Sequence, residues 1–184
     1  MIGLTAIFWM FVILFGIIGA MRGWARELLV TFSVILAVFI ITVLETFAPV
    51  IKDMLASNAT TDFWVRTFVL IGLVFFGYQS PNIARLAGAS NRFAREKLQD
   101  SLLGFLLGAI NAYLFVGSLL WYLDAAFKAN GSFPVAFIIP PDANTDIGLA
   151  YFDLLKRLPP VWLTGVTIYI AVAIAFAFVL IVFL

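Results

Sequence analysis

The sequence contains no cysteine and no histidine among its 184 residues. Without cysteine the chain can form no disulfide, thiolate nucleophile, iron–sulfur cluster or thioether-attached haem. Without histidine it lacks the commonest metal ligand and the usual general base. Haem or chlorophyll would need an unusual axial ligand, and catalysis would rest on carboxylates, lysine or hydroxyls. We therefore expect no cofactor, no metal site and no catalytic residue, and we predict that the protein is not an enzyme.

Charged residues are also scarce. They make up 11% of the chain, against 64% hydrophobic residues, and the formal net charge is only +1. A mean hydropathy of +1.12 excludes an ordinary soluble domain. The small net charge gives no indication of nucleic acid as a partner.

Long charge-free runs account for this composition. In hydrocarbon every backbone N–H and C=O must be satisfied within the protein, so each run is predicted to be a helix. About 20 apolar residues are needed to cross a bilayer. In the third run the membrane part is predicted to be Phe63–Tyr78, with Arg66 reaching toward the surface. The fold class is thus all-α, a polytopic membrane bundle of five transmembrane helices. The five runs are Met1–Met21, Leu28–Leu44, Thr67–Ala84, Ser101–Leu123 and Leu158–Leu184.

Two segments near the C-terminus differ from the rest. Residues 147–158 carry apolar side chains at helical spacing, which predicts a short amphipathic helix that either lies on the bilayer or packs on the bundle. The last run is apolar on all sides, so it is predicted to be an anchor or a helix that docks on another protein through residues 161–184. We accordingly divide the chain into a four-helix unit, 1–158, and a C-terminal helix, 159–184.

The orientation follows from the first connection. Arg22 and Arg26 lie within six residues between two spans, and arginine-dense loops stay on the cytoplasmic side. The sequence therefore predicts an N-terminus outside and a C-terminus inside the membrane.

The fourth run carries small and polar residues on one helical face. Such a stripe lets another helix approach closely, and we favour packing inside the bundle over a substrate pathway. A stripe of Gly16, Ala20 and Gly23 in the first run makes these two spans predicted neighbours. The face of the fourth run comprises Asp100, Gly104, Gly108, Asn111, Phe115, Ser118 and Tyr122.

Arg22 and Arg26 lie four residues apart on one helical face. They are predicted to hold Asp100 or Glu27 at the inner interface, with Asp100 pairing to one of the two arginines. An alternative function is binding of an anion or a lipid headgroup, because the guanidinium offers two parallel donors. Charge flanking that only fixes the orientation is the simplest explanation, but it does not require Gly23 between the arginines.

In this order the motifs resemble the colicin V production protein family (CvpA), small bacterial inner-membrane proteins. The first motif is Arg22-Gly23-Trp24-Ala25-Arg26-Glu27, which is similar to the family's R-G-x-x-R-E hairpin. The second is similar to its D-x-x-x-G-x-x-x-G element, formed here by Asp100, Gly104 and Gly108. The resemblance covers residues 1–158 and four spans, so the fifth span is an addition to the family pattern.

The resemblance implies a fold and a compartment more than a mechanism. It implies a non-catalytic protein of the bacterial inner membrane that supports envelope homeostasis or export by associating with other membrane proteins. The runner-up is an accessory subunit of a large photosynthetic or respiratory complex, suggested by the extra span and by the 20 phenylalanines and 5 tryptophans. A transporter or channel is less favoured, since Asn111 is essentially the only polar residue expected near the middle of the membrane.

Overall fold

The computed structural model describes residues 3–79, 94–136 and 138–183, and within them the regular structure is entirely helical. This confirms the all-α membrane bundle. The helices are α1 (Leu4–Arg22), α2 (Trp24–Phe47), α3 (Pro49–Ser57), α4 (Ala59–Tyr78), α6 (Ala94–Asn130), α7 (Asp146–Leu155), α8 (Pro159–Trp162) and α9 (Val166–Phe183).

Among the described residues, four helices are long and apolar enough to cross a bilayer: α1, α2, α4 and α6. The helices α2 and α6 extend past both ends of the charge-free runs that predicted them, and α4 begins eight residues before its run. The helix α6 has 37 residues, which corresponds to about 55 Å. It therefore projects beyond a hydrocarbon layer of about 30 Å. Residues 80–84, the end of the third predicted run, lie outside the described residues.

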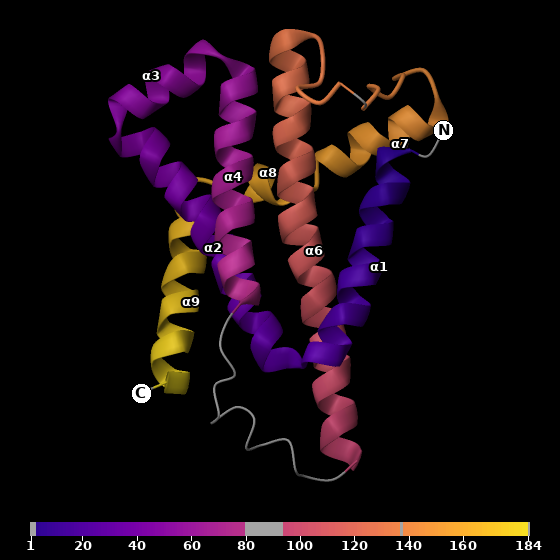
Figure 1. Ribbon diagram of the computed structural model, residues 1–184, viewed down its shortest axis with the longest axis vertical. Coiled ribbons are helices and arrows are strands. Elements are labelled where there is room, and N and C mark those ends of the chain that lie inside the picture. Colours follow the sequence, from indigo (N-terminus) through magenta and orange to yellow (C-terminus); the bar gives the residue numbers. More distant parts are fainter. Residues whose placement is uncertain (1–2, 80–93, 137, 184) are drawn as a thin grey trace.

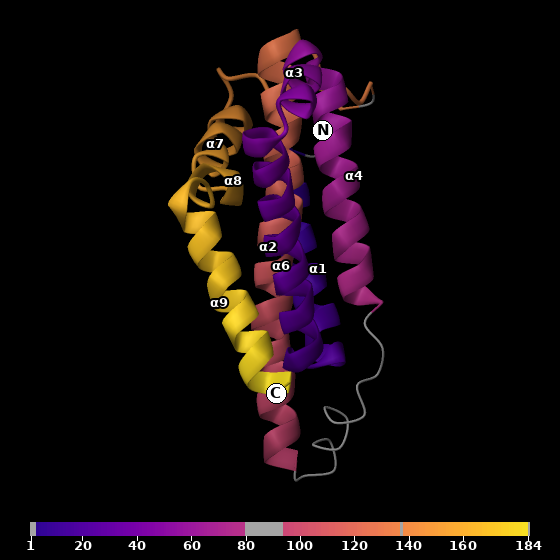
Figure 2. The same cartoon turned by 90° about the vertical axis from the view of Figure 1, so that its left-hand side faces the viewer.

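The predicted fifth span, Leu158–Leu184, is not one continuous helix. Pro159 and Pro160 begin the four-residue helix α8, and Gly165 then adopts a positive φ of 52° before α9 starts at Val166. The two prolines fit the start of α8, where no N–H is needed. The break between α8 and α9 lies at Gly165, because its positive φ is not a helical conformation. In Figures 1 and 2, α9 runs from the level of α8 to the hairpin between α1 and α2. That it crosses the membrane stays a prediction.

The long helix α6 lies at the centre of the bundle and packs against α1, α2 and α4 (Figure 1). Fully buried apolar side chains fill much of the space between these helices, among them Val30, Val34, Leu70 and Ala112. Large apolar side chains also cover the outer faces of α1, α4 and α6. An apolar exterior around an apolar core is what a bilayer as solvent requires.

The prediction that the first and fourth spans are neighbours is confirmed, and glycine explains how closely they approach. A Cβ added to Gly19 would lie 2.2 Å from the Gly104 carbonyl oxygen, and one added to Gly108 would lie the same distance from that of Phe15. The helix α1 thus contacts α6 at Gly16, Gly19 and the following Gly23. The predicted Ala20 also meets α6, since its carbonyl accepts the Ser101 hydroxyl at 3.1 Å. Gly19, which the sequence prediction did not name, provides the closest backbone contact.

The amphipathic helix packs on the bundle, which is one of the two alternatives that the sequence left open. Tyr151, Leu154 and Leu155 of α7 are buried, and the Tyr151 hydroxyl is 3.4 Å from an Asp124 carboxylate oxygen on α6. The predicted inward residue Ile147 is half exposed, while Tyr151, which was not predicted, is buried. The helix ends at Leu155, three residues before the predicted end.

The C-terminal helix α9 packs on α2. The rings of Phe39 and Tyr169 meet edge to face with centroids 5.7 Å apart, and those of Phe32 and Phe178 lie 5.6 Å apart. Ile168 is fully buried in this contact. One face of α9 thus belongs to the chain's own bundle, and only its remaining faces are open to lipid or to a partner.

Candidate functional site

The hairpin between α1 and α2 turns on Gly23. Its φ of 87° lies in the region that glycine adopts without strain, and its N–H donates to the Gly19 carbonyl at 2.9 Å. The same residue ends α1 and precedes α2, so the connection between the two spans is a single residue.

Asp100 of α6 closes the hairpin from outside. Its Oδ1 accepts the backbone N–H of Trp24, the first residue of α2, at 3.1 Å. The N-cap position of α2 is glycine and offers no side chain for capping, so a carboxylate from another helix takes that place. The negative charge of the carboxylate is also stabilised by the positive N-terminal end of the α2 dipole.

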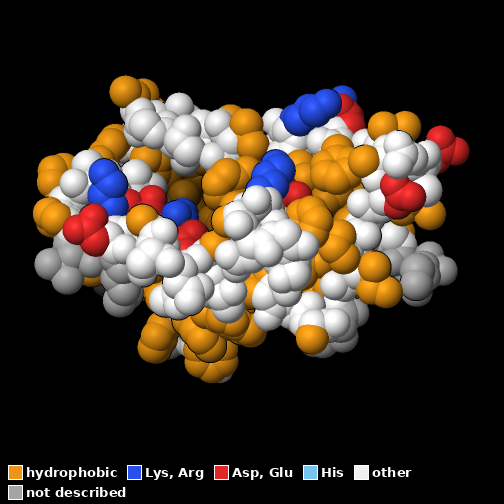
Figure 3. Space-filling view, turned by 90° about the horizontal axis from the view of Figure 1, so that it is seen from above, with side chains coloured by type: hydrophobic (Ala, Val, Ile, Leu, Met, Phe, Trp, Pro, Cys, Tyr) orange, Lys and Arg blue, Asp and Glu red, His pale blue; other side chains and the backbone are white. Residues whose placement is uncertain are grey.

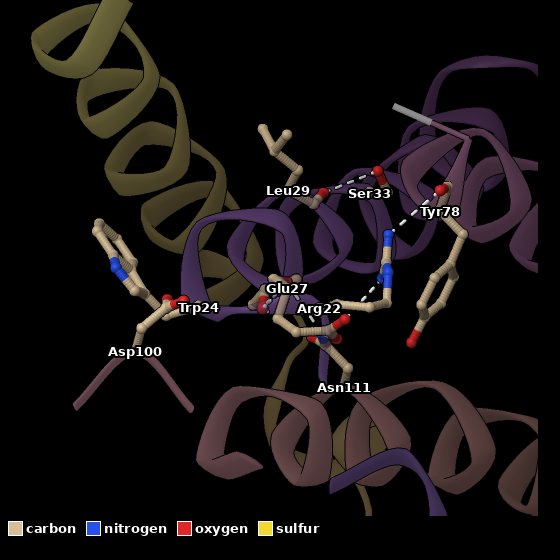
Figure 4. A network of polar contacts seen from close by, with 9 residues as sticks. Arg22, Trp24, Glu27, Leu29, Ser33, Tyr78, Asp100 and Asn111 are labelled. Carbon is tan, nitrogen blue, oxygen red and sulfur yellow. Dashed lines mark hydrogen bonds and ion pairs between the residues drawn. The ribbon is translucent and has the colours of Figure 1, made fainter. Parts of the chain in front are cut away.

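Glu27, one turn further along α2, is fully buried. Its Oε1 is 2.6 Å from Nη1 of Arg22, the last residue of α1. Arg22 also donates through Nη2 to the Tyr78 carbonyl at 3.2 Å and lies over the Tyr78 ring, 4.3 Å from its centroid (Figure 4). The buried carboxylate is therefore matched by a cation that also holds the C-terminal end of α4.

Asn111 completes this group from α6 and is likewise fully buried. Its amide Nδ2 donates to both the backbone carbonyl and Oε2 of Glu27, each at 2.9 Å (Figure 4). Its Oδ1 accepts the hydroxyl of Thr31 at 2.6 Å. We call Arg22, Glu27, Thr31, Tyr78 and Asn111 the inner polar network; it joins α1, α2, α4 and α6.

The structure brings most of the predicted motif residues to this end of the bundle. Arg22 pairs with Glu27, one of the two predicted partners, while Asp100 caps α2 through Oδ1. The alternative pairing of Asp100 with Arg26 stays a prediction. Arg26 lies on the exposed side of α2. Gly104 and Gly108 form the close contact with α1, and Asn111 enters the network.

The rest of the predicted stripe does not all face the same helix. The Phe115 ring still meets that of Phe15 on α1, with the centroids 6.4 Å apart. Ser118 donates to the Leu114 carbonyl of its own helix, and the Tyr122 ring lies 5.5 Å from the Arg66 guanidinium of α4. The stripe turns from α1 to α4 because α6 crosses its neighbours. Sequence reasoning missed Thr31 and Tyr78; the only signal for Thr31 was its place four residues after Glu27, on one helical face.

A second charged group occupies the other end of the bundle. Arg66 of α4 lies 2.7 Å from both a Glu45 oxygen of α2 and an Asp62 oxygen of its own helix, so it is paired as well as near the surface. Figure 3 views this end and shows basic side chains lying beside acidic ones. Each end of α2 therefore carries a carboxylate, matched by an arginine from another helix that lies over a tyrosine ring.

The described residues contain no group of three or more acidic side chains placed to hold a metal ion. The inner polar network joins four helices: the side chains of Arg22, Glu27, Thr31 and Asn111 bind one another, and Tyr78 takes part through its carbonyl and ring, while its buried hydroxyl has no partner. It can hold the helices in register in a medium that offers no water to replace these bonds.

Residues 4–137 match the family model of the colicin V production protein. The chain belongs to that family. The match contains the hairpin, the Asp100 cap, the glycine contact and the whole inner polar network, whereas α7, α8 and α9 lie beyond it. Searches of curated proteins and of solved structures found no match to the chain.

Proposed function

We propose that this multi-pass protein of the colicin V production family is a non-catalytic protein of the bacterial inner membrane. In this proposal it supports envelope homeostasis or export by associating with other membrane proteins. The observation that carries the proposal is the use of the buried polar groups. Glu27 and Asn111 bind Arg22, Thr31 and each other, and Arg22 also binds the Tyr78 carbonyl, so these groups hold four helices together.

The surface for association is proposed to be α9. This helix lies outside the region that matches the family, so it is an addition to a unit that the family shares. Its inner face covers α2, while Ile170, Ile174 and Ile181 are exposed. An apolar face of this kind fits the apolar face of a partner helix as well as it fits lipid.

The proposed orientation places the Gly23 hairpin in the cytoplasm and the α3 end of the bundle outside. Arg22 and Arg26 at the hairpin support it through the positive-inside rule. The N-terminal end of α1 and the C-terminal end of α9 lie at opposite ends of the bundle (Figures 1 and 2), which agrees with termini on opposite sides.

The test is native mass spectrometry of gently solubilised membranes. The variant replaces Ile174 and Ile181 with alanine on the outer face of α9, and a matched control replaces Ile13 and Ile17 on the exposed face of α1. We expect a stoichiometric membrane-protein partner with the wild type and the control, and its loss with the α9 variant. A monomer or homo-oligomer without any partner would overturn the proposal.

A second candidate is an accessory subunit of a large photosynthetic or respiratory complex. It is favoured by the same fact, that α9 extends the chain beyond the family unit. The partner in the experiment distinguishes the two: co-purification with a pigment- or haem-containing assembly supports the accessory subunit, and a colourless partner supports the envelope function.

A further inference from the structure

The turn between α7 and α8 presents two adjacent cations. Lys156 and Arg157 have side chains 75% and 74% exposed. Asp153 lies 2.9 Å from Arg157 and 4.0 Å from Lys156, so one carboxylate faces two positive charges. The three side chains together carry a net charge of +1, and both cations remain largely exposed beside Asp153.

The depth of this turn is fixed by its contacts with the bundle. The Tyr113 hydroxyl of α6 donates to the Arg157 carbonyl, and Leu158 is fully buried. A Cβ added to Gly117 would lie 3.1 Å from Leu158 and 3.0 Å from Pro159. In Figures 1 and 2, α7 and α8 are level with the beginning of α1, well short of the far ends of α4 and α6.

This depth corresponds to the edge of the hydrocarbon layer. Gly117 lies about 26 Å along α6 from Asp100, at 1.5 Å per residue. The hydrocarbon core is about 30 Å thick. Tyr113, which binds the Arg157 carbonyl, lies about 20 Å from Asp100 by the same rise. With Asp100 at one boundary, the turn lies about 4–10 Å inside the opposite one, and long Lys and Arg side chains reach from there to the phosphate groups.

The surroundings of the two cations are apolar. Leu149 precedes them on the open side of α7, and Val161 and Trp162 follow them on α8, all with exposed side chains. Tryptophan is typical of the membrane interface, where its ring lies at headgroup level. A surface with two cations beside exposed apolar side chains matches a lipid, which offers a phosphate and acyl chains together.

We propose that Lys156 and Arg157 bind the phosphate of an anionic lipid headgroup, in the leaflet at the end of the bundle opposite Gly23. The site lies outside the region that matches the family. A lipid fits it better than free phosphate because the turn is held at bilayer depth beside apolar side chains. The proposal does not depend on the proposed association of α9 with a partner.

The test measures lipid retention by native mass spectrometry of the full chain, with phosphatidylglycerol and phosphatidylcholine as probes. The variant is Lys156→Gln with Arg157→Gln, and the matched control is Lys52→Gln with Lys97→Gln, two other exposed lysines. Each basic residue near an anionic membrane surface contributes about 1 kcal/mol, so the variant should bind phosphatidylglycerol about tenfold more weakly or worse. The control should bind it as the wild type does.

Equal retention of phosphatidylglycerol by wild type and variant would overturn the proposal, as would equal retention of the two lipids by the wild type. A second measurement tests the depth alone. Because the chain has no cysteine, a spin label at Lys156→Cys reports only that position. We expect intermediate access to both oxygen and an aqueous paramagnetic reagent; fully aqueous behaviour, like that of Ser57→Cys in the α3 end, would contradict a lipid-binding turn.

Discussion

The Asp100 carboxylate occupies the space that a side chain at position 23 would need. A Cβ on Gly23 would lie 2.8 and 2.9 Å from the two carboxylate oxygens, and Oδ1 accepts the N–H of Trp24 just beyond the glycine. The two motifs that characterise the sequence, one in the hairpin and one in α6, are therefore one structural unit. Gly23 provides the turn and the room, and Asp100 provides the cap that the turn lacks.

Gly23→Ala is expected to destabilise the bundle through both effects. At φ 87° and ψ 155° the Gly23 backbone lies in a region almost restricted to glycine, where another residue costs about 1–3 kcal/mol. The added methyl group would also displace Asp100 from the α2 N-terminus. Gly165→Ala is the matched control, because Gly165 has a φ of 52° with no atom within 4 Å of the added Cβ. Thermal unfolding in detergent should show a larger loss for Gly23→Ala. Equal losses would mean that the Asp100 contact contributes nothing beyond the backbone strain.

Gly108→Leu is expected to separate α1 from α6. Even the first added carbon would lie 2.2 Å from the Phe15 carbonyl oxygen, which backbone atoms cannot relieve without moving a helix. Adding bulk to a packed core already costs about 1–3 kcal/mol for a methylene. Gly72→Leu on α4 is the control, since nothing lies within 4 Å of its Cβ position. The yield of monodisperse folded protein in mild detergent measures both, and similar yields would contradict the close α1–α6 contact.

The sequence predicted those features that depend on hydrophobicity and on local spacing. Charge-free runs located four helices, and the small residues of the fourth run indicated its approach to α1. Ion-pair partners on different helices were harder to predict, because Asp100 and Arg22 could each pair with more than one residue of opposite charge. The choice depends on where α6 crosses the hairpin, and spacing along one helix does not contain that information. Tyr78 entered the network through its ring and its carbonyl, which carry no charge signal.

Removal of Arg22 alone should cost more stability than removal of its ion pair as a whole. Arg22→Met leaves the Glu27 carboxylate buried without its cation, and breaking a buried pair from one side typically costs about 3–5 kcal/mol. In the double variant Arg22→Met with Glu27→Leu no charge is stranded, so part of the loss should be recovered. The unfolding free energies of the wild type, the two single variants and the double variant give the coupling energy between Arg22 and Glu27. Losses that simply add would mean that this coupling energy is zero and would contradict the prediction.

Asp153→Ala serves as the comparison for that cycle. It removes the carboxylate from an exposed pair with Arg157, and exposed pairs contribute only about 0–1 kcal/mol. If Asp153→Ala lost as much unfolding free energy as Arg22→Met, burial would not be what distinguishes the Arg22–Glu27 pair from the Asp153–Arg157 pair.

Tyr151 is expected to make the protein sensitive to alkaline pH. Burial, and then the adjacent Asp124 carboxylate, raise the pKa of the Tyr151 hydroxyl above its ordinary value. A pKa raised in the folded state stabilises the protein below the unfolded pKa, about 10 for tyrosine, and this contribution is lost as pH rises further. The stability difference between wild type and Tyr151→Phe should therefore shift against the wild type above pH ~10. A difference that stays constant in thermal unfolding from pH 8 to 11 would contradict this burial.

The proposed orientation predicts which positions an impermeant thiol reagent reaches in intact cells. The chain has no native cysteine, so each introduced cysteine reports alone. Ser57→Cys and Ser132→Cys lie at exposed positions toward the α3 end, and Gln99→Cys is exposed on α6 beside the hairpin. We expect labelling of the first two in intact cells, and of Gln99→Cys only after the membrane is permeabilised, because the arginines of the hairpin hold that end in the cytoplasm. Labelling of Gln99→Cys alone would invert the orientation. Labelling of all three in intact cells would show that the two ends of the bundle do not lie on opposite sides of the membrane.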